Sequence, residues 1–226
     1  MSQESAGAPT RVRALLVEVA DPDRALAMAA YMKGIAPYLG VPTPVRRAAT
    51  RDWVRRFDPG PDAADLLEAA RALCAAPERE FAYVALDLVA RHQRALPGAS
   101  LPSLRALALT RPWWDTVDAW AQIIGRGGLR HPTWDAQVAG WATDPHLWAR
   151  RIALVFQVGR RDAVDLGILF GACRANLADR DFFMRKGIGW GLRDAARTHP
   201  DEVRAFVSAH REELSGLSVR EATKHL

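Results

Sequence analysis

The sequence predicts an all-α protein whose short helices stack in antiparallel pairs, and three observations support this. Apolar residues recur along the 226 residues at the three-to-four-residue spacing of one helix face. Short segments rich in Pro, Gly and Asp separate these stretches, and several stretches begin at a proline, which is favoured in the first helical turn. No segment combines β-branched residues with strict alternation, so we expect no β-strand.

Prolines and capping residues set the expected helix starts. Thr43-Pro44 precedes one helix, Pro77 another, Ser100 a third and His199-Pro200 a fourth, while Asp144 is expected as an N-cap with Pro145 in the first turn. The remaining helices are predicted from amphipathic spacing alone. In order, the expected ranges are 10–19, 23–35, 45–57, 62–75, 78–96, 101–109, 112–124, 132–142, 145–158, 163–177, 180–198, 201–214 and 218–226.

The spacing of these helices suggests a repeat architecture. A pair recurs about every thirty to forty residues, which is typical of an α-solenoid of HEAT-like repeats, here without a visible sequence repeat. The alternative is an irregular helical bundle. A solenoid offers a long concave surface and a bundle an enclosed pocket. We expect residues 1–9 to be flexible and residues 10–226 to form a single repeat domain.

Composition excludes several classes of protein. Hydrophobic residues make up 49% and charged residues 25%, as in globular proteins. No apolar run approaches the ~18 residues of a membrane span, and residues 1–9 lack the pattern of a secretory signal. Cys74 and Cys173 are far apart and form no CxxC motif, and the histidines have no metal-ligand spacing. We therefore expect a cytoplasmic protein without a bound metal or disulfide framework.

The charge balance suggests a phosphate-containing partner. Lys plus Arg outnumber Asp plus Glu by 31 to 26, and only Lys33, Lys186 and Lys224 are lysines. Guanidinium groups match phosphate oxygens bidentately. A GC-rich genome would produce the same bias. The arginine doublets are Arg46-Arg47, Arg55-Arg56, Arg150-Arg151 and Arg160-Arg161.

Tryptophan is unevenly distributed, with six of the eight between residues 113 and 148. Consecutive Trp113 and Trp114 point about 100° apart on a helix, so both cannot face the same buried stripe. Trp114 and Asp118 are four residues apart and share one helix face. An aromatic ring beside a carboxylate is suited to binding a cation. The alternatives are core packing for the tryptophans and a solvated position for Asp118.

Four ordered motifs give the chain a resemblance to a known family. They are Arg111–Asp118 (RPWWDTVD), Tyr31–Gly40 (YMKGIAPYLG) with Thr43–Arg47, Asp144–Ala153 (DPHLWARRIA), and Asp181–Arg193 (DFFMRKGIGWGLR) with Leu214–Ala222. These resemble the DNA alkylation repair family of AlkD-like glycosylases over roughly residues 20 to 226. The resemblance implies a HEAT-like solenoid that holds duplex DNA in a basic concave cleft and excises N3- and N7-alkylated purines without a metal or other cofactor. We expect the protein to act as a monomer.

The resemblance also assigns roles to residues. The active-site aromatic pair falls on Trp114 and Trp190, the catalytic carboxylate on Asp118 and the cleft arginine on Arg151. The further residues predicted to bind DNA are Tyr31, Arg150, Lys186 and Arg193. Pro42 departs from the family pattern, in which relatives often carry a polar residue such as Gln, so a DNA contact made there in relatives is in doubt.

The chemistry of such a site follows from the residue types. An alkylated purine already carries a positive charge and leaves readily, whereas the deoxyribose develops oxocarbenium character. Asp118 would stabilise that charge and orient water, and the tryptophans would contribute ~0.5–2 kcal/mol each through cation–π contacts. Arg151 would either anchor a phosphate or fix the orientation of Asp118. Neutral damaged bases would be poor substrates.

The sequence also allows other functions for the chain and other roles for these residues. The chain could be a non-catalytic helical-repeat protein that binds duplex or branched DNA, or a protein–protein scaffold. Lys186 could act as a Schiff-base nucleophile, but a structural ion pair explains it equally well, so we expect a monofunctional glycosylase. Gly187, Gly189 and Gly191 indicate a close approach of the backbone, either to a neighbouring helix or to DNA.

Overall fold

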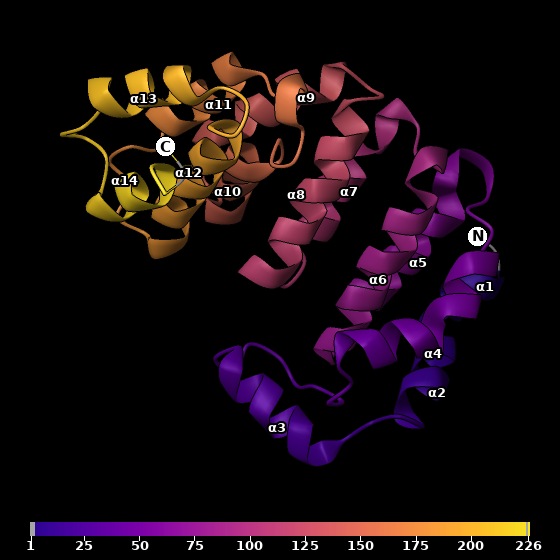
Figure 1. Cartoon of the computed structure of the whole chain (residues 1–226). Helices are drawn as coiled ribbons and strands as arrows, with labels where there is room; N and C mark the ends of the chain where they lie inside the picture. Colours follow the sequence, from indigo (N-terminus) through magenta and orange to yellow (C-terminus); the bar gives the residue numbers. More distant parts are fainter. Residues whose placement is uncertain (1–2, 225) are drawn as a thin grey trace. The chain divides into compact units, whose positions relative to one another are not determined.

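The computed structural model describes residues 3–224 and 226, and this part of the chain is helical without a strand, which confirms the all-α prediction. Contacts divide the chain into two compact units, one up to Thr116 and one from Val117 (Figure 1). The helices of the first unit are α1 (Gln3–Ala6), α2 (Ala8–Val17), α3 (Pro22–Tyr31), α4 (Thr43–Arg56), α5 (Ala64–Ala75), α6 (Arg79–His92) and α7 (Leu101–Ala108).

The helix α8 (Trp114–Gly128) starts at the end of the first unit and runs into the second. The other helices of the second unit are α9 (Thr133–Ala139), α10 (Leu147–Val155), α11 (Leu166–Arg174), α12 (Phe182–Ala195), α13 (Pro200–Ala209) and α14 (Gly216–Ala222). Each of the predicted helices is present. Among the described helices, none is long and apolar enough to cross a membrane.

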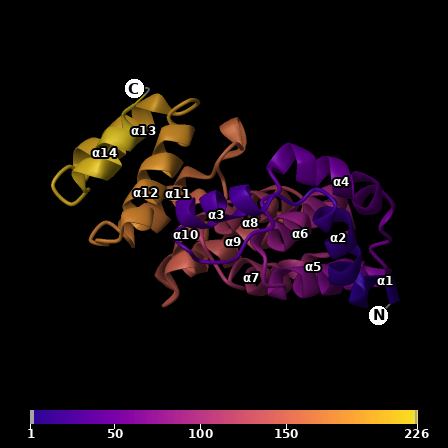
Figure 2. The same ribbon diagram turned by 90° about the horizontal axis from the view of Figure 1, so that it is seen from below.

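In the first unit, α5 and α6 form the central helix pair, against which α2, α4 and α7 pack (Figure 2). Leu66 and Leu73 of α5 and Val84 and Leu88 of α6 are completely buried in it. Burying such a side chain contributes roughly 1.5–3 kcal/mol. This interior fixes α6, whose outward-facing residues reach the candidate site.

The N-terminal segment packs against this pair. Residues 1–9 are predicted to be flexible, yet Ser5 and Ala8 are fully buried, and the Ser5 hydroxyl donates a hydrogen bond to Asp65 Oδ1 at 3.0 Å. The helix α1, which amphipathic spacing did not predict, packs on α5. Met1 and Ser2 lie outside the described residues.

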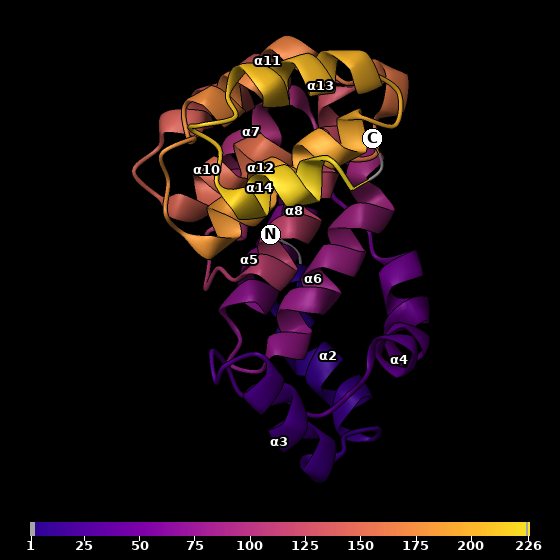
Figure 3. The same ribbon diagram turned by 60° about the vertical axis from the view of Figure 1, so that its left-hand side comes forward.

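In the second unit, α12 packs against both α10 and α14 (Figure 3). A Cβ atom on Gly189 would lie 2.4 Å from Glu221 Cβ and 3.0 Å from the Ser218 carbonyl oxygen, and one on Gly191 would lie 2.7 Å from the Leu154 carbonyl oxygen. Of the two explanations open for these glycines, close approach to neighbouring helices is the one observed. They allow α12 to pack tightly and so position Trp190.

We expect Gly189→Ala to destabilise the protein by roughly 1–3 kcal/mol, because the added methyl group cannot be accommodated without separating α12 from α14. Gly171→Ala is the matched control. Gly171 lies within α11 with open space around its Cβ position, so alanine there should stabilise the protein by about 0.5–1 kcal/mol. Urea denaturation of both variants measures the difference, and equal effects would contradict the packing argument.

The N-cap of α10 differs from the prediction. Asp144 was expected to cap a helix beginning at Pro145, but α10 begins at Leu147 with His146 as N-cap, and His146 Nδ1 accepts a hydrogen bond from the Trp148 backbone N–H at 3.2 Å. The Asp144 carboxylate accepts instead from the His146 N–H at 2.8 Å. Asp144 therefore closes a turn before the helix, a local bond that aspartate also favours.

Candidate active site

The first residue of α8, Trp114, is half-buried and lines a hollow of about 390 Å³ in the first unit. Tyr31, at the C-terminal end of α3, lines the same hollow and is 73% exposed. The structure thus brings together two residues that the sequence assigned to the site. The other lining residues are Ala27, Met28, Met32, Tyr38, Thr43, Tyr83 and Asp115.

Sequence reasoning missed Tyr38 and Tyr83 as residues of this hollow. The chain contains three tyrosines, and all three line it. A scarce aromatic residue with a polar tip, concentrated at one place, is the signal that could have pointed to them. Together with Trp114 they give the hollow an aromatic wall with hydroxyl groups.

A buried hydrogen-bond network supports the start of α8. Asp115 Oδ1 accepts from Arg79 Nη2 at 2.6 Å, and Asp115 Oδ2 accepts from Arg79 Nε at 2.9 Å and from the Tyr83 hydroxyl at 2.6 Å. Arg79 also donates to Thr116 Oγ1 at 2.9 Å and to the Arg111 carbonyl oxygen at 2.7 Å. Because these acceptors flank Trp114 on both sides in sequence, the network fixes the indole-bearing end of the helix.

The Tyr83 hydroxyl acts as a hydrogen-bond donor in this network. Burial raises the pKa of Tyr83 well above its ordinary value, and the charge of Asp115 and the hydrogen bond to it raise the pKa further. Tyr38 and Tyr83 share a hydrogen bond between their hydroxyl oxygens at 3.1 Å. Because the Tyr83 phenol stays protonated, it continues to donate a hydrogen bond to the partly buried carboxylate of Asp115.

The helix α3 has no buried residue of its own and is held by its connections. The fully buried carboxylate of Glu80 accepts hydrogen bonds at 2.9–3.1 Å from the backbone N–H groups of Leu39, Gly40 and Val41. The Asp21 N–H, before α3, donates to the Leu39 carbonyl oxygen at 2.9 Å. This clamp fixes the loop that follows Tyr31.

In the second unit, Asp118 of α8 and Arg151 of α10 form a bidentate ion pair, with Nε–Oδ1 at 2.7 Å and Nη2–Oδ2 at 2.8 Å. The Arg151 Nη1 group donates to the Phe183 carbonyl oxygen. The side chain of Asp118 is 18% exposed and that of Arg151 is 6% exposed. Two charge-assisted hydrogen bonds restrict the rotation of the carboxylate, so the site presents an oriented carboxylate, paired with Arg151, at a partly exposed position.

This geometry distinguishes the two roles considered for Arg151. Each of its three nitrogen atoms donates a hydrogen bond inside the protein, and with 6% of the side chain exposed little of the guanidinium is accessible to a phosphate. The geometry therefore supports the orienting role, in which Arg151 fixes the carboxylate of Asp118. Substitution of Arg151 is therefore not expected to remove a direct contact with a DNA phosphate.

On α12, Lys186, Trp190 and Arg193 follow the spacing of one helix face. Glu221 of α14 pairs with both cations: Lys186 Nζ lies 2.8 Å from Oε1, and Arg193 contacts Oε2. The hydrogen bond from Lys186 lowers the pKa of Glu221, and the charge of Arg193 contributes. The structural ion pair considered for Lys186 is thus observed, and one positive charge of the two remains beside half-buried Trp190.

Arg150, the neighbour of Arg151, is also tied into the structure. Its Nη2 group pairs with Asp179 Oδ2 at 2.9 Å, its Nε group donates to Asn176 Oδ1 at 3.1 Å, and its Nη1 group donates to the Asp144 carbonyl oxygen at 3.0 Å. The guanidinium therefore joins the segments before α10 and α12. A role of Arg150 in DNA binding stays a prediction.

A family model described as DNA alkylation repair enzyme matches residues 12–226. The chain belongs to the DNA alkylation repair enzyme family. A solved structure described as a predicted DNA alkylation repair enzyme from Enterococcus faecalis is 28% identical, with a TM-score of 0.84, over 92% of this chain and 96% of that chain. No curated protein matches the chain.

Membership of this family supports a role in DNA repair of alkylation damage, as the sequence motifs predicted. It also supports DNA as the substrate. Within the described residues, no three His, Cys, Asp or Glu side chains are grouped so that they could hold a metal ion.

Proposed function

We propose that the protein is a monofunctional DNA glycosylase that hydrolyses the N-glycosidic bond of cationic N3- and N7-alkylated purines in duplex DNA. The observation that carries the proposal is the bidentate Asp118–Arg151 pair, a fixed and partly exposed carboxylate on the helix that begins with Trp114. We place its activity in the first step of base excision repair in the cytoplasm, with the protein acting as a monomer.

The chemistry requires a stabilised cation more than a strong acid. When the bond between C1′ and the purine nitrogen breaks, its electron pair neutralises the positive purine, which leaves without prior protonation. Positive charge then develops on the deoxyribose. The ionised carboxylate of Asp118 stabilises that charge and orients a water molecule toward C1′. The water oxygen bonds to C1′, and the proton it loses passes to the carboxylate or to solvent.

The aromatic residues are assigned to the cationic nucleotide. The ring faces of Trp114 and Trp190 would attract the charged purine or sugar, an interaction of ~0.5–2 kcal/mol each. Tyr31, which is highly exposed, would flank the nucleotide. Arg193 and Lys186 would contact the DNA backbone through the positive charge that Glu221 does not neutralise.

The ion pair of Lys186 bears on the lyase question. Its ammonium group is engaged in an ion pair with the Glu221 carboxylate at 2.8 Å, whereas a Schiff-base nucleophile must be a neutral amine that is free to attack C1′. We expect no covalent complex with DNA after borohydride treatment and no strand cleavage without added alkali. A trapped complex that disappears in Lys186→Met would contradict the monofunctional assignment.

The test of the proposed function is incubation of the purified protein with methylated duplex DNA, followed by chromatography of the released bases. We expect 3-methyladenine and 7-methylguanine to be released, and neutral lesions to be released poorly. Binding of the duplex without any released base would instead support the alternative function, a non-catalytic helical-repeat protein that binds duplex or branched DNA.

A further inference from the structure

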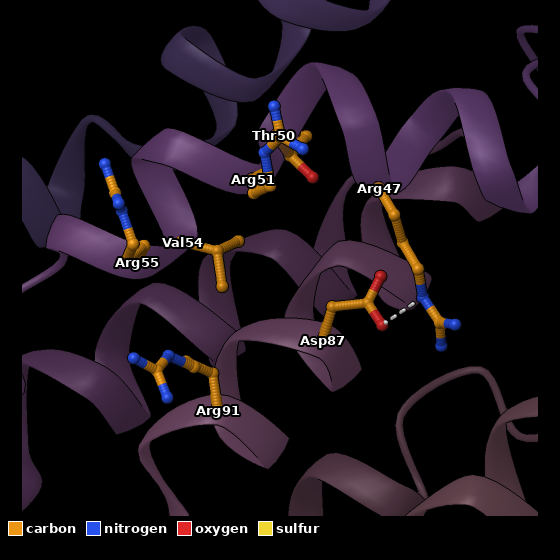
Figure 4. Close-up of a pocket in the computed structure, with 7 residues that line it drawn as sticks. All are labelled: Arg47, Thr50, Arg51, Val54, Arg55, Asp87 and Arg91. Carbon is orange, nitrogen blue, oxygen red and sulfur yellow. Dashed lines mark hydrogen bonds and ion pairs between the residues drawn. The ribbon is translucent and has the colours of Figure 1, made fainter.

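A basic groove of the first unit lies between α4 and α6. It has a volume of about 350 Å³ and is separate in its lining from the hollow at Trp114. In Figure 4, Arg55 and Arg91 lie toward one end of this groove and Arg47 and Asp87 toward the other, with Val54 between them. The lining residues are Arg47, Thr50, Arg51, Val54, Arg55, Asp87 and Arg91.

The arginines of α4 form a row. Arg47, Arg51 and Arg55 are spaced four residues apart, so their side chains leave one face of the helix at successive rises of about 6 Å. Arg91 of α6 adds a fourth guanidinium group from the opposite wall. A row of this kind is suited to a ligand with repeated negative charges rather than to a single anion.

Most of this positive charge is not neutralised. Asp87 is the one carboxylate of the lining, and it is shared by Arg47 at 3.0 Å and by the buried Arg46 at 3.1 Å. Arg55 pairs with Asp52 at 3.4 Å, where both side chains are more than half exposed and such a pair is weak.

Arg51 and Arg91 are both exposed, and neither side chain has a hydrogen bond or ion pair within the part of the chain that the structure describes. Their donors are therefore available to a ligand without the loss of any internal contact, unlike those of Arg151.

The floor of the groove is apolar. Val54 and Thr50 are buried, and the Thr50 hydroxyl donates to the Arg46 carbonyl oxygen at 2.9 Å, so it is already used within the helix. A ligand that fits must therefore combine an uncharged face with regularly spaced anions. A deoxyribose–phosphate strand has this combination, since its sugars are largely apolar and its phosphates accept bidentate guanidinium bonds.

We propose that the groove between α4 and α6 binds the sugar–phosphate backbone of duplex DNA, with Arg51 and Arg91 as its phosphate-binding residues. Asp87 holds Arg46 and Arg47 in place and so fixes one wall. The proposal takes its ligand from the proposed function but concerns affinity and not base release.

The test uses the full chain and a fluorescently labelled, unmodified duplex, with binding measured by anisotropy over a range of salt concentrations. Arg51→Ala/Arg91→Ala should weaken binding roughly tenfold and should make the slope of log K against log salt shallower by about 2, one unit for each lost phosphate contact. Arg51→Lys/Arg91→Lys should retain most of the slope, because a lysine still neutralises a phosphate.

The matched control is Arg11→Ala/Arg56→Ala, which removes the same charge from two exposed positions of the same unit outside the groove. Equal losses in the two double variants, or an unchanged slope in Arg51→Ala/Arg91→Ala, would overturn the proposal. A wild-type protein that releases no alkylated purine would instead overturn the proposed function while leaving the groove supported by its salt slope.

Discussion

Asp118→Asn is expected to lower the single-turnover rate of 7-methylguanine release at least about tenfold, the effect of losing one electrostatic stabiliser. Asparagine keeps the shape of the side chain, and its amide oxygen can still accept a hydrogen bond from Arg151, but the negative charge that opposes the oxocarbenium-like sugar is lost. Affinity for duplex DNA should remain nearly unchanged, because Asp118 is not expected to contact phosphate. Chromatography of released bases and anisotropy of labelled duplex measure the two quantities.

Asp179→Asn is the control for this experiment. Asp179 pairs with Arg150 at 2.9 Å, and its side chain is 18% exposed, as is that of Asp118. Both substitutions remove a carboxylate from a partly buried arginine pair, so both should lower the melting temperature. Base release should fall only in Asp118→Asn. Unchanged release in Asp118→Asn, or an equal loss in Asp179→Asn, would show that Asp118 does not carry the chemistry.

The helices and the Asp118–Arg151 pair could be predicted from the sequence for different reasons. Helices follow from local spacing, proline positions and capping, which act within a few residues. The pairing of Asp118 with Arg151 joins residues 33 apart in sequence, and only the resemblance of the motifs to a family linked them. Even then two roles for Arg151 were open, and its internal hydrogen bonds and low exposure favour the orienting role.

Other parts of the site have no local signature. The Glu80 carboxylate binds backbone groups 39 to 41 residues earlier in the chain, and nothing in the α6 sequence distinguishes it from an exposed glutamate. The sequence analysis did not single out the row Arg47, Arg51, Arg55, because the opposing Arg91 and the apolar floor that give it meaning appear only after α4 and α6 pack together. The reason for the glycines in α12 likewise became clear only from the helices α10 and α14 that pack beside them.

Arg79→Met is expected to lower the free energy of unfolding by roughly 3–5 kcal/mol, the cost of removing one partner of a buried ion pair. Methionine fills similar space, so the loss reports charge and hydrogen bonding rather than a cavity. Arg79 is 2% exposed and donates to Asp115, Thr116 and the Arg111 carbonyl oxygen. Without it, Asp115 keeps only the hydroxyl of Tyr83 among the donors described above. Urea denaturation monitored by tryptophan fluorescence measures the change.

Arg71→Met tests whether burial is the cause. Arg71 pairs with Glu68 at 2.6 Å, the same separation as Arg79 and Asp115, but the Arg71 side chain is 68% exposed. Because solvent screens that pair, its loss should change the unfolding midpoint little. Tyr83→Phe should cost about 1 kcal/mol, the usual contribution of one hydrogen bond. Similar losses in Arg71→Met and Arg79→Met would mean that the network below Trp114 does not hold the start of α8, and that packing of the helix alone fixes the indole.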